Sequence, residues 1–186
     1  MEKFIKVYDN LIPIEIQNLI ESNSLVKLPW YYTNNFEEFE PDKSAPALSH
    51  FFLNSGTDAT NTLDSTPYPY SFFYSNILYR LAHKENLHID TIYTGRLFMN
   101  LPTPNPTPDS IHIDLPYPHW VCLYYVTDSD GDTVLFEDDR KTEIKRITPK
   151  KGRIVFFDGS IPHHSSKPAK NTRVIVNFDF KGYKFR

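Results

Sequence analysis

The second half of the sequence consists of short runs of β-favouring residues separated by turns, and this pattern restricts the fold more than any other feature. The runs are rich in Val, Ile, Phe, Tyr and Thr, which are enriched in strands. They lie at residues 91–101, 111–114, 120–127, 133–136, 142–148, 153–157 and 173–180. Turn signals such as Asp130-Gly131-Asp132 separate them, and helical periodicity is absent there. This half therefore predicts an antiparallel sandwich or barrel rather than a parallel α/β sheet.

The first half of the sequence contains two helical patterns. Pro13 is a suitable first residue for a helix in which Ile16, Leu19 and Ile20 share one face. A longer pattern of aromatic and aliphatic residues at helical spacing runs over residues 69–87, and we interpret its aromatic stripe as core. The predicted fold class is therefore mainly β with N-terminal helices.

Four further segments are extended in this interpretation, three as strands and one as a connection. Residues 4–8 predict a strand before the first helix, and residues 30–32 and 48–53 predict strands within a region interrupted by acidic residues, Pro, Asn and Ser. Proline alternates with other residues through 101–109, which predicts a stiff extended connection rather than a strand. Such a connection can form the wall of a pocket.

The composition fits a single globular domain. The chain has 186 residues, of which 40% are hydrophobic and 23% are charged. The formal charge of −3, with no long run of Lys or Arg, disfavours a nucleic-acid partner. A lone cysteine, Cys122, cannot form an internal disulfide, and no apolar run approaches the ~20 residues that a membrane span needs. With no signal-peptide pattern at the N-terminus, we expect a cytoplasmic protein without a membrane partner.

Two His-x-Asp triplets stand out as candidate metal ligands, one at residues 88–90 and one at 112–114. With 7 His and 23 acidic residues in 186, about one His-x-acid triplet is expected by chance. The triplet alone therefore does not choose a site.

The residues that follow distinguish the two triplets. Residues 112–114 precede an aromatic strand, a tight turn and further strands, and then the run Phe157-Asp-Gly-Ser-Ile-Pro-His163. Arg173 follows ten residues later. His88 has no such set of strands around it, so we interpret His88 and Asp90 as structural.

This ordered set resembles the 2-oxoglutarate- and iron-dependent dioxygenases, in particular their prolyl-4-hydroxylase-like branch, over residues 94–181. The resemblance implies a double-stranded β-helix, the jelly-roll core that cupins share, in which His112, Asp114 and His163 bind one face of Fe(II). Two imidazoles and one carboxylate suit this metal and leave positions for co-substrate and dioxygen. We expect one domain over 1–186, with residues 1–90 as helical support and substrate side and 91–181 as the catalytic core.

The resemblance also implies residues for the co-substrate 2-oxoglutarate. Arg173 matches the family cation that binds the far carboxylate, and a guanidinium fork fits a carboxylate well. Tyr125 resembles the family tyrosine that hydrogen-bonds the same carboxylate, and Asn100 resembles a polar position on the strand before the His-x-Asp triplet. Ascorbate is an accessory reductant in this scheme.

The adjacent pair His163 and His164 leaves a choice, since neighbouring strand residues point to opposite faces. In the family pattern the ligand lies six residues after the aromatic residue, here Phe157, which favours His163. His164 is then expected to point away or toward the pocket rim.

The function that the resemblance implies is hydroxylation of a C–H bond, with 2-oxoglutarate converted to succinate and carbon dioxide. Peptidyl proline is the first substrate candidate, and a free amino acid or another small molecule is the alternative. Two functions of other classes remain open: a cupin-like module that binds metal without turnover, and a zinc hydrolase with the same three ligands. Arg173 together with Tyr125 favours the oxygenase, because neither rival needs a partner for a dicarboxylate.

Overall fold

The computed structural model describes residues 3–33, 47–54 and 69–185. Along the chain the elements are β1 (Ile5–Tyr8), α1 (Ile14–Ser22), the π-helical turn η1 (Asn23–Lys27), β2 (Tyr31–Thr33), β3 (Ala47–Asn54), α2 (Pro69–Glu85), β4 (Leu87–Asn100), β5 (Trp120–Tyr125), β6 (Thr133–Phe136), β7 (Glu143–Ile147), β8 (Ile154–Asp158), β9 (His163–Ser165) and β10 (Arg173–Lys184). The prediction of a mainly β chain with N-terminal helices is confirmed. Among the described helices, none is long and apolar enough to span a bilayer.

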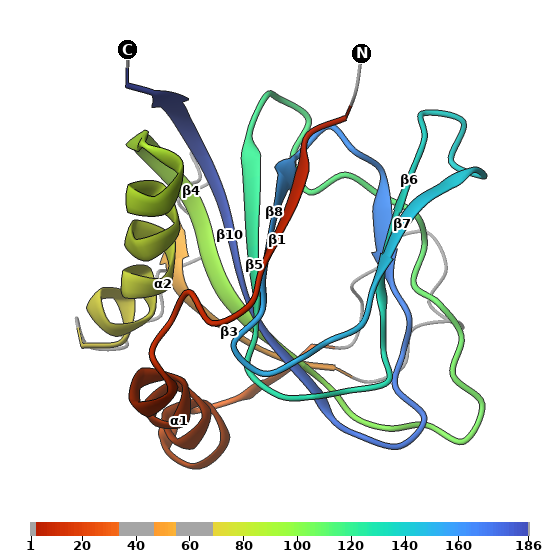
Figure 1. Ribbon diagram of the computed structural model, residues 1–186. Helices are drawn as coiled ribbons and strands as arrows, with labels where there is room; N and C mark the ends of the chain where they lie inside the picture. Colours follow the sequence, from red (N-terminus) through yellow and green to blue (C-terminus); the bar gives the residue numbers. More distant parts are fainter. Residues whose placement is uncertain (1–2, 34–46, 55–68, 186) are drawn as a thin grey trace.

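The strands form two antiparallel sheets. The larger has the order β1-β8-β5-β10-β4-β3-β2, and the smaller has the order β7-β6-β9. In Figure 1, β6 and β7 lie on one side of the large sheet, while α1 and α2 lie on the other. The molecule therefore has three layers, helices, large sheet and small sheet, and the two sheets make the sandwich that a jelly roll requires.

Side-chain alternation along the central strands divides the core into two clusters. On β5, Cys122 and Tyr124 belong to the cluster that the helices cover, whereas Leu123 and Tyr125 belong to the cluster between the two sheets. All four residues are buried. The large sheet thus has no solvent-facing side at its centre, which explains why β5 and β8 read as almost continuous apolar runs.

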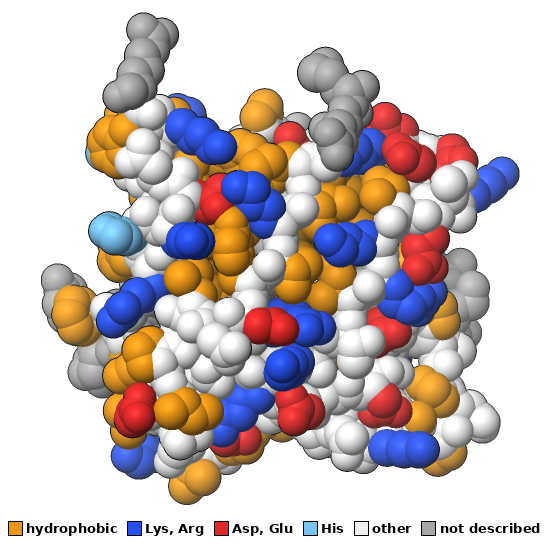
Figure 2. Space-filling view, viewed as in Figure 1, with side chains coloured by type: hydrophobic (Ala, Val, Ile, Leu, Met, Phe, Trp, Pro, Cys, Tyr) orange, Lys and Arg blue, Asp and Glu red, His pale blue; other side chains and the backbone are white. Residues whose placement is uncertain are grey.

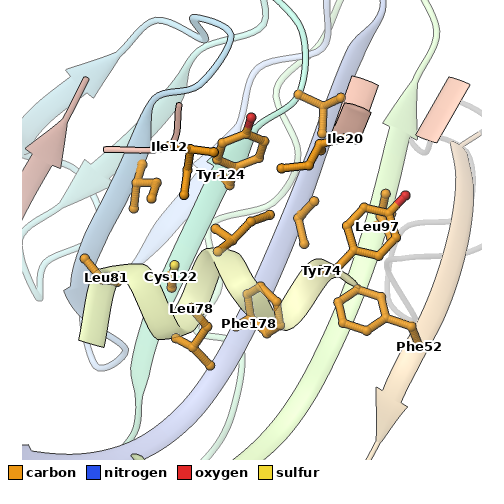
Figure 3. Close-up of a cluster of buried hydrophobic side chains, with 14 of the residues drawn as sticks. Ile12, Ile20, Phe52, Tyr74, Leu78, Leu81, Leu97, Cys122, Tyr124 and Phe178 are labelled. Atoms are coloured by element: carbon orange, nitrogen blue, oxygen red, sulfur yellow. The ribbon is translucent and has the colours of Figure 1, made fainter. Parts of the chain in front are cut away.

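Helix α2 supplies most of the helical layer. Tyr74, Ile77, Leu78 and Leu81 recur at the spacing of one helix face, and each is at most 1% exposed. Figure 3 shows Tyr74, Leu78 and Leu81 directed at the sheet, where Phe178 meets them. Burying each of these side chains contributes about 1.5–3 kcal/mol. The predicted helix over 69–87 is confirmed, with its end at Glu85.

Helix α1 forms where predicted but buries a different face. Ile20 is buried, yet Leu19 is 51% exposed and Ile16 also lies at the surface. The buried partner of Ile20 is Gln17, whose Nε2 donates to the carbonyl of Ile12 at 2.7 Å. The prediction that Ile16, Leu19 and Ile20 share the buried face was therefore wrong. This short helix buries only Gln17 and Ile20.

The segment before β5 also differs from its prediction. Residues 111–114 are not a strand, because only a single bridge, between His112 and His163, ties them to the small sheet. The bridge joins them to β9, which is absent from the predicted β-favouring runs, although His163 and His164 were treated as strand residues. The proline-containing stretch 101–109 forms no strand, as expected, since proline has no N–H to donate.

Charge is distributed without a dominant sign on the face drawn in Figure 2. Lys and Arg side chains are interspersed there with Asp, Glu and apolar side chains. Such a mixed surface does not produce the extended positive field that attracts a phosphate backbone.

Candidate metal and co-substrate site

Three side chains predicted as metal ligands meet in one place. The backbones of His112 and His163 exchange two hydrogen bonds of 2.9 Å, which brings their rings to a centroid separation of 4.8 Å. Asp114 completes the group, with Oδ2 3.5 Å from His163 Nε2 and Oδ1 3.9 Å from His112 Nε2. One ligand atom from each residue lies within 4.8 Å of the other two.

Backbone carbonyls orient both imidazole rings. His112 Nδ1 lies 2.9 Å from the carbonyl oxygen of Ser110, and His163 Nδ1 lies 3.0 Å from that of Ile161. A ring whose Nδ1–H donates to a carbonyl presents the lone pair of Nε2 to the other side. The group thus offers two imidazole nitrogens and a carboxylate from one side, which fits Fe(II).

The charges of the three ligands support one another. Burial works against ionisation of Asp114, but the nearby Arg96 and the two histidines hold its pKa well below the usual range. Burial lowers the pKa of His112, and His163 lowers it further. Burial also disfavours charged His163, yet the bond to Asp114 raises the pKa of His163 overall. In the metal-free protein, protonated His163 therefore balances the negative charge of Asp114.

The three predicted ligands, His112, Asp114 and His163, are called the metal group below. Arg96 on β4 connects this group to a second buried acid. Its Nη2 donates to Asp114 Oδ1 at 2.6 Å and lies 3.4 Å from Asp179 Oδ2. Asp179 is fully buried and accepts from the hydroxyl of Thr94 at 2.5 Å. Burial raises the pKa of Asp179 to about 6, and the charge of Asp114 adds to this rise. Such ties to a metal ligand typically set its orientation and its basicity.

A second group of ligand atoms overlaps the first. Asp114, His119 and Asp179 also bring one atom each within 4.8 Å of one another. Here the guanidinium of Arg96 already contacts both carboxylates, so a metal ion would meet a positive charge. The group with His112 and His163 therefore fits a metal ion better.

Arg173, at the start of β10, lies in the same cavity as the metal group. It is 2% exposed, and its Nη2 donates to Thr133 Oγ1 at 3.0 Å while Nη1 lies 3.4 Å from Asn100 Oδ1. Among the described residues no carboxylate lies within ion-pair distance of it, and its Nε has no hydrogen-bond partner. A buried guanidinium without a counter-charge is costly, so this position calls for an anion.

The cavity that joins these groups has a volume of about 610 Å³. One wall follows the paired strands β10 and β4, where the cavity-lining residues of β10 face those of β4 in the pairs Arg173 and Asn100, Ile175 and Phe98, and Asn177 and Arg96. Arg173 and Asn177 are four residues apart, roughly 13 Å along the strand. The wall therefore runs from a cationic end, past an apolar middle, to the metal group.

Tyr125 lies one layer behind this wall. Its hydroxyl donates to Thr133 Oγ1 at 2.7 Å, and Thr133 rather than Tyr125 lines the cavity. Its ring lies 5.8 Å from the central carbon of the Arg173 guanidinium. Asn100 does line the cavity, beside Arg173. Direct contact of Tyr125 with the co-substrate stays a prediction, and Thr133 is a neighbour that the sequence pattern did not single out.

The other histidines considered from the sequence lie outside the metal group. His88 stands near the start of β4, with its ring against Tyr183 at 4.8 Å, and Asp90 pairs with Lys181 at 2.9 Å. His164 is buried, packs against Phe136 at 5.2 Å and lines the cavity.

Comparison with known proteins identifies the family. The model of the 2OG-Fe(II) oxygenase superfamily matches residues 78–181. No curated protein matches the chain. Similar solved structures include an oxidoreductase of the 2OG-Fe(II) oxygenase family from Burkholderia pseudomallei, with 8% identity, a TM-score of 0.63 and coverage of 95% of this chain and 84% of that one.

Two prolyl hydroxylases have similar folds. A prolyl-4-hydroxylase from Pseudomonas putida is 12% identical, with a TM-score of 0.62 and coverage of 96% of this chain and 93% of that one. A prolyl hydroxylase from Trichoplax adhaerens, solved in complex with a peptide fragment of the hypoxia inducible factor oxygen degradation domain, is 14% identical, with a TM-score of 0.62 and coverage of 95% and 82%. The predicted jelly-roll fold is thereby confirmed. The chain belongs to the 2OG-Fe(II) oxygenase superfamily and is an oxidoreductase that uses Fe(II), 2-oxoglutarate and dioxygen.

Proposed function

We propose that His112, Asp114 and His163 bind the iron and that Arg173 binds the far carboxylate of 2-oxoglutarate. The observation that carries this proposal is that the three ligand residues line the same cavity as the buried guanidinium of Arg173. Among the residues that the structure describes, this guanidinium has no counter-ion. A dicarboxylate can bridge such a pair of sites, with one end at the metal and the other at Arg173. Neither a zinc hydrolase nor a passive metal-binding module has use for the second cation.

The side chains of the chain hold and orient the reactants. Bound iron would allow dioxygen to oxidise 2-oxoglutarate and a substrate C–H bond together: one oxygen atom enters succinate, the other becomes the new hydroxyl, and carbon dioxide is released. Asn100 and Thr133 fix the fork of Arg173, and we propose that Tyr125 supports the same end. Phe98 and Ile175 form an apolar middle section that limits water beside the reacting atoms.

We propose that the substrate is a residue of a protein or peptide, with peptidyl proline as the first candidate and a free amino acid or other small molecule as the second. The side chain of His112 is 49% exposed, so the metal group lies close to the mouth of the cavity. Ile113 is exposed beside it, and the extended segment that leads to His112 forms part of the rim. An open, partly apolar mouth suits a chain that lies across the site better than a small molecule that must be enclosed.

We further propose that the chain acts as one domain in the cytoplasm. The pairing of β1 with β8 and of β3 with β4 ties residues before 90 into the sheet that carries the site. The lone Cys122 is free and buried, as suits a reducing compartment.

The substrate proposal can be tested with the iron-loaded protein in air. Proline-rich peptides, free proline and single-stranded oligonucleotides are each incubated with 2-oxoglutarate and ascorbate, and the gain of one oxygen is followed by mass together with succinate release. We expect both signals with peptides only, and neither in His163→Ala. Oxygen gain on free amino acids or oligonucleotides, with none on any peptide, would refute the peptide proposal and leave the hydroxylase assignment intact.

A further inference from the structure

A second cation and one acid lie at the Arg173 end of the cavity. Lys167 and Asp109 both line the cavity, and Lys167 Nζ lies 3.3 Å from Asp109 Oδ1. The side chain of Lys167 is only 4% exposed. A lysine this deeply buried is uncommon unless it is paired, so Asp109 accounts for its position.

The segment that carries Asp109 is fixed against the strand end that carries Lys167. The backbone N–H of Asp109 donates to the carbonyl of Ser165 at 2.9 Å, and the hydroxyl of Ser165 donates to the Asp109 carboxylate. Further along, the N–H of Thr103 donates to the carbonyl of Pro168 at 3.0 Å. These bonds hold the carboxylate of Asp109, which is 24% exposed, at the cavity wall.

Asp109 also acts on the co-substrate end electrostatically. Burial lowers the pKa of Arg173, and Asp109 is among the groups whose negative charge opposes that effect. The same negative charge repels any carboxylate that approaches Arg173, because like charges in a partly desolvated cavity interact strongly. The negative charge of Asp132 also acts on Arg173, but Asp132 has its own partner in Arg146, at 3.6 Å. Lys167 is the partner that offsets Asp109.

We propose that Lys167 is a positioning residue for 2-oxoglutarate binding: it neutralises Asp109 and holds it in the cavity wall, so that Arg173 presents an uncompensated positive charge to the co-substrate. This inference rests on the proposed role of Arg173. If Lys167 instead contacted 2-oxoglutarate directly, it would be needed whatever the charge of Asp109. A positioning role predicts that Lys167 becomes dispensable once Asp109 has lost its charge.

A double-mutant cycle separates these possibilities. The dissociation constant of 2-oxoglutarate is measured anaerobically from the visible absorption of the iron-bound chelate, in Lys167→Met, Asp109→Asn and the double variant. Lys167→Met should weaken binding by about ten- to a hundredfold, since it leaves an unpaired carboxylate beside the ligand. Asp109→Asn should bind at least as tightly as the unmodified chain, and the double variant should return to within about threefold of it. Lys167→Arg, which keeps the charge, should behave like the unmodified chain.

Three measurements keep the outcome specific. Lys170→Met removes an equal charge from an exposed position outside the cavity and should leave the dissociation constant unchanged. Arg173→Ala tests the proposed function separately: if that variant binds 2-oxoglutarate normally, the co-substrate site is wrong, whatever Lys167 does. Thermal unfolding and metal titration of each variant report the fold.

The inference is overturned if Lys167→Met binds 2-oxoglutarate normally, or if the double variant stays as weak as Lys167→Met. Should Lys167→Met fail to fold, Asp109→Asn decides: a loss of more than tenfold in that variant contradicts a repulsive role for the carboxylate.

Discussion

The two faces of β10 are equally buried but chemically opposite. Toward the helices, the strand places Val174, Val176 and Phe178, while toward the small sheet it places polar and charged residues around Ile175. Asp179 and Phe178 are both 0% exposed. The difference teaches that burial alone does not identify the core of this molecule. One face is held by apolar contact, whereas the other is a polar cavity wall in which Asp179 pairs with Arg96 and Arg173 has no described counter-ion.

The largest effect on stability is expected on the helix face. Phe178→Ala removes a ring that lies 5.5 Å from that of Phe52 in an edge-on contact, and should lower the free energy of unfolding by about 3–5 kcal/mol. Chemical denaturation measures this change. At a temperature where the variant is folded, its affinity for 2-oxoglutarate should be unchanged, and a parallel loss of affinity would show that the two faces are not independent.

On the cavity face the expected loss is in binding rather than in stability. Arg173→Ala should weaken 2-oxoglutarate binding by about 2–5 kcal/mol, because it removes a charge-assisted pair from a desolvated site. Metal affinity should stay nearly intact, since Arg173 contacts Thr133 and Asn100 rather than the metal group. Calorimetric titration with the metal and then with 2-oxoglutarate separates the two effects, and an unchanged co-substrate affinity would remove Arg173 from the site.

Protons should compete with the metal for His163. Its pKa is raised by Asp114 although burial disfavours the charged ring. Below that raised pKa the ring is protonated on both nitrogens and cannot ligate, so metal affinity should fall about tenfold per pH unit as pH decreases, and should level off above the pKa. Titrating Co(II) or Mn(II) over a pH series checks the direction. Affinity that is constant from acid to neutral pH would contradict the assignment of His163 as a ligand.

Tyr125 should produce the smallest of these effects. Tyr125→Phe removes the donor to Thr133 Oγ1, and a neutral hydrogen bond contributes about 0.5–1.5 kcal/mol. Co-substrate affinity should therefore decrease by no more than about tenfold. A loss as large as that of Arg173→Ala would show that the hydroxyl contacts 2-oxoglutarate directly, and that Tyr125 belongs in the cavity wall rather than behind it.

Much of the apolar framework was predictable from local pattern. The helix at residues 69–85 follows from aromatic and aliphatic residues at regular spacing, and the strands of the second half follow from β-favouring runs between turns. Patterns failed where tertiary contacts decide the structure. Helix α1 buries Gln17 rather than Leu19. Strand β9 has only three residues, and it forms because they pair with β6.

The candidate site was partly predictable for a similar reason. His112, Asp114 and His163 are separated in the sequence, but their order and spacing resemble those of a known family, and the structure brings them together. The ionic contacts behind them carried no such signal. Arg96 meets Asp179 only because β4 and β10 are neighbours in the sheet, and Lys167 meets Asp109 only because the proline-containing segment lies along β9. In the sequence each of these is an ordinary charged residue.

The choice between the adjacent histidines tests the proposed metal site most directly. Anaerobic titration of His163→Ala and His164→Ala with Fe(II), followed by 2-oxoglutarate, reports both metal binding and the visible absorption of the chelate. We predict that His163→Ala loses both signals, because its Nε2 lies 3.5 Å from Asp114, while His164→Ala, whose ring packs on Phe136, retains them. Full iron affinity and chelate absorption in His163→Ala, with their loss in His164→Ala, would contradict the assignment.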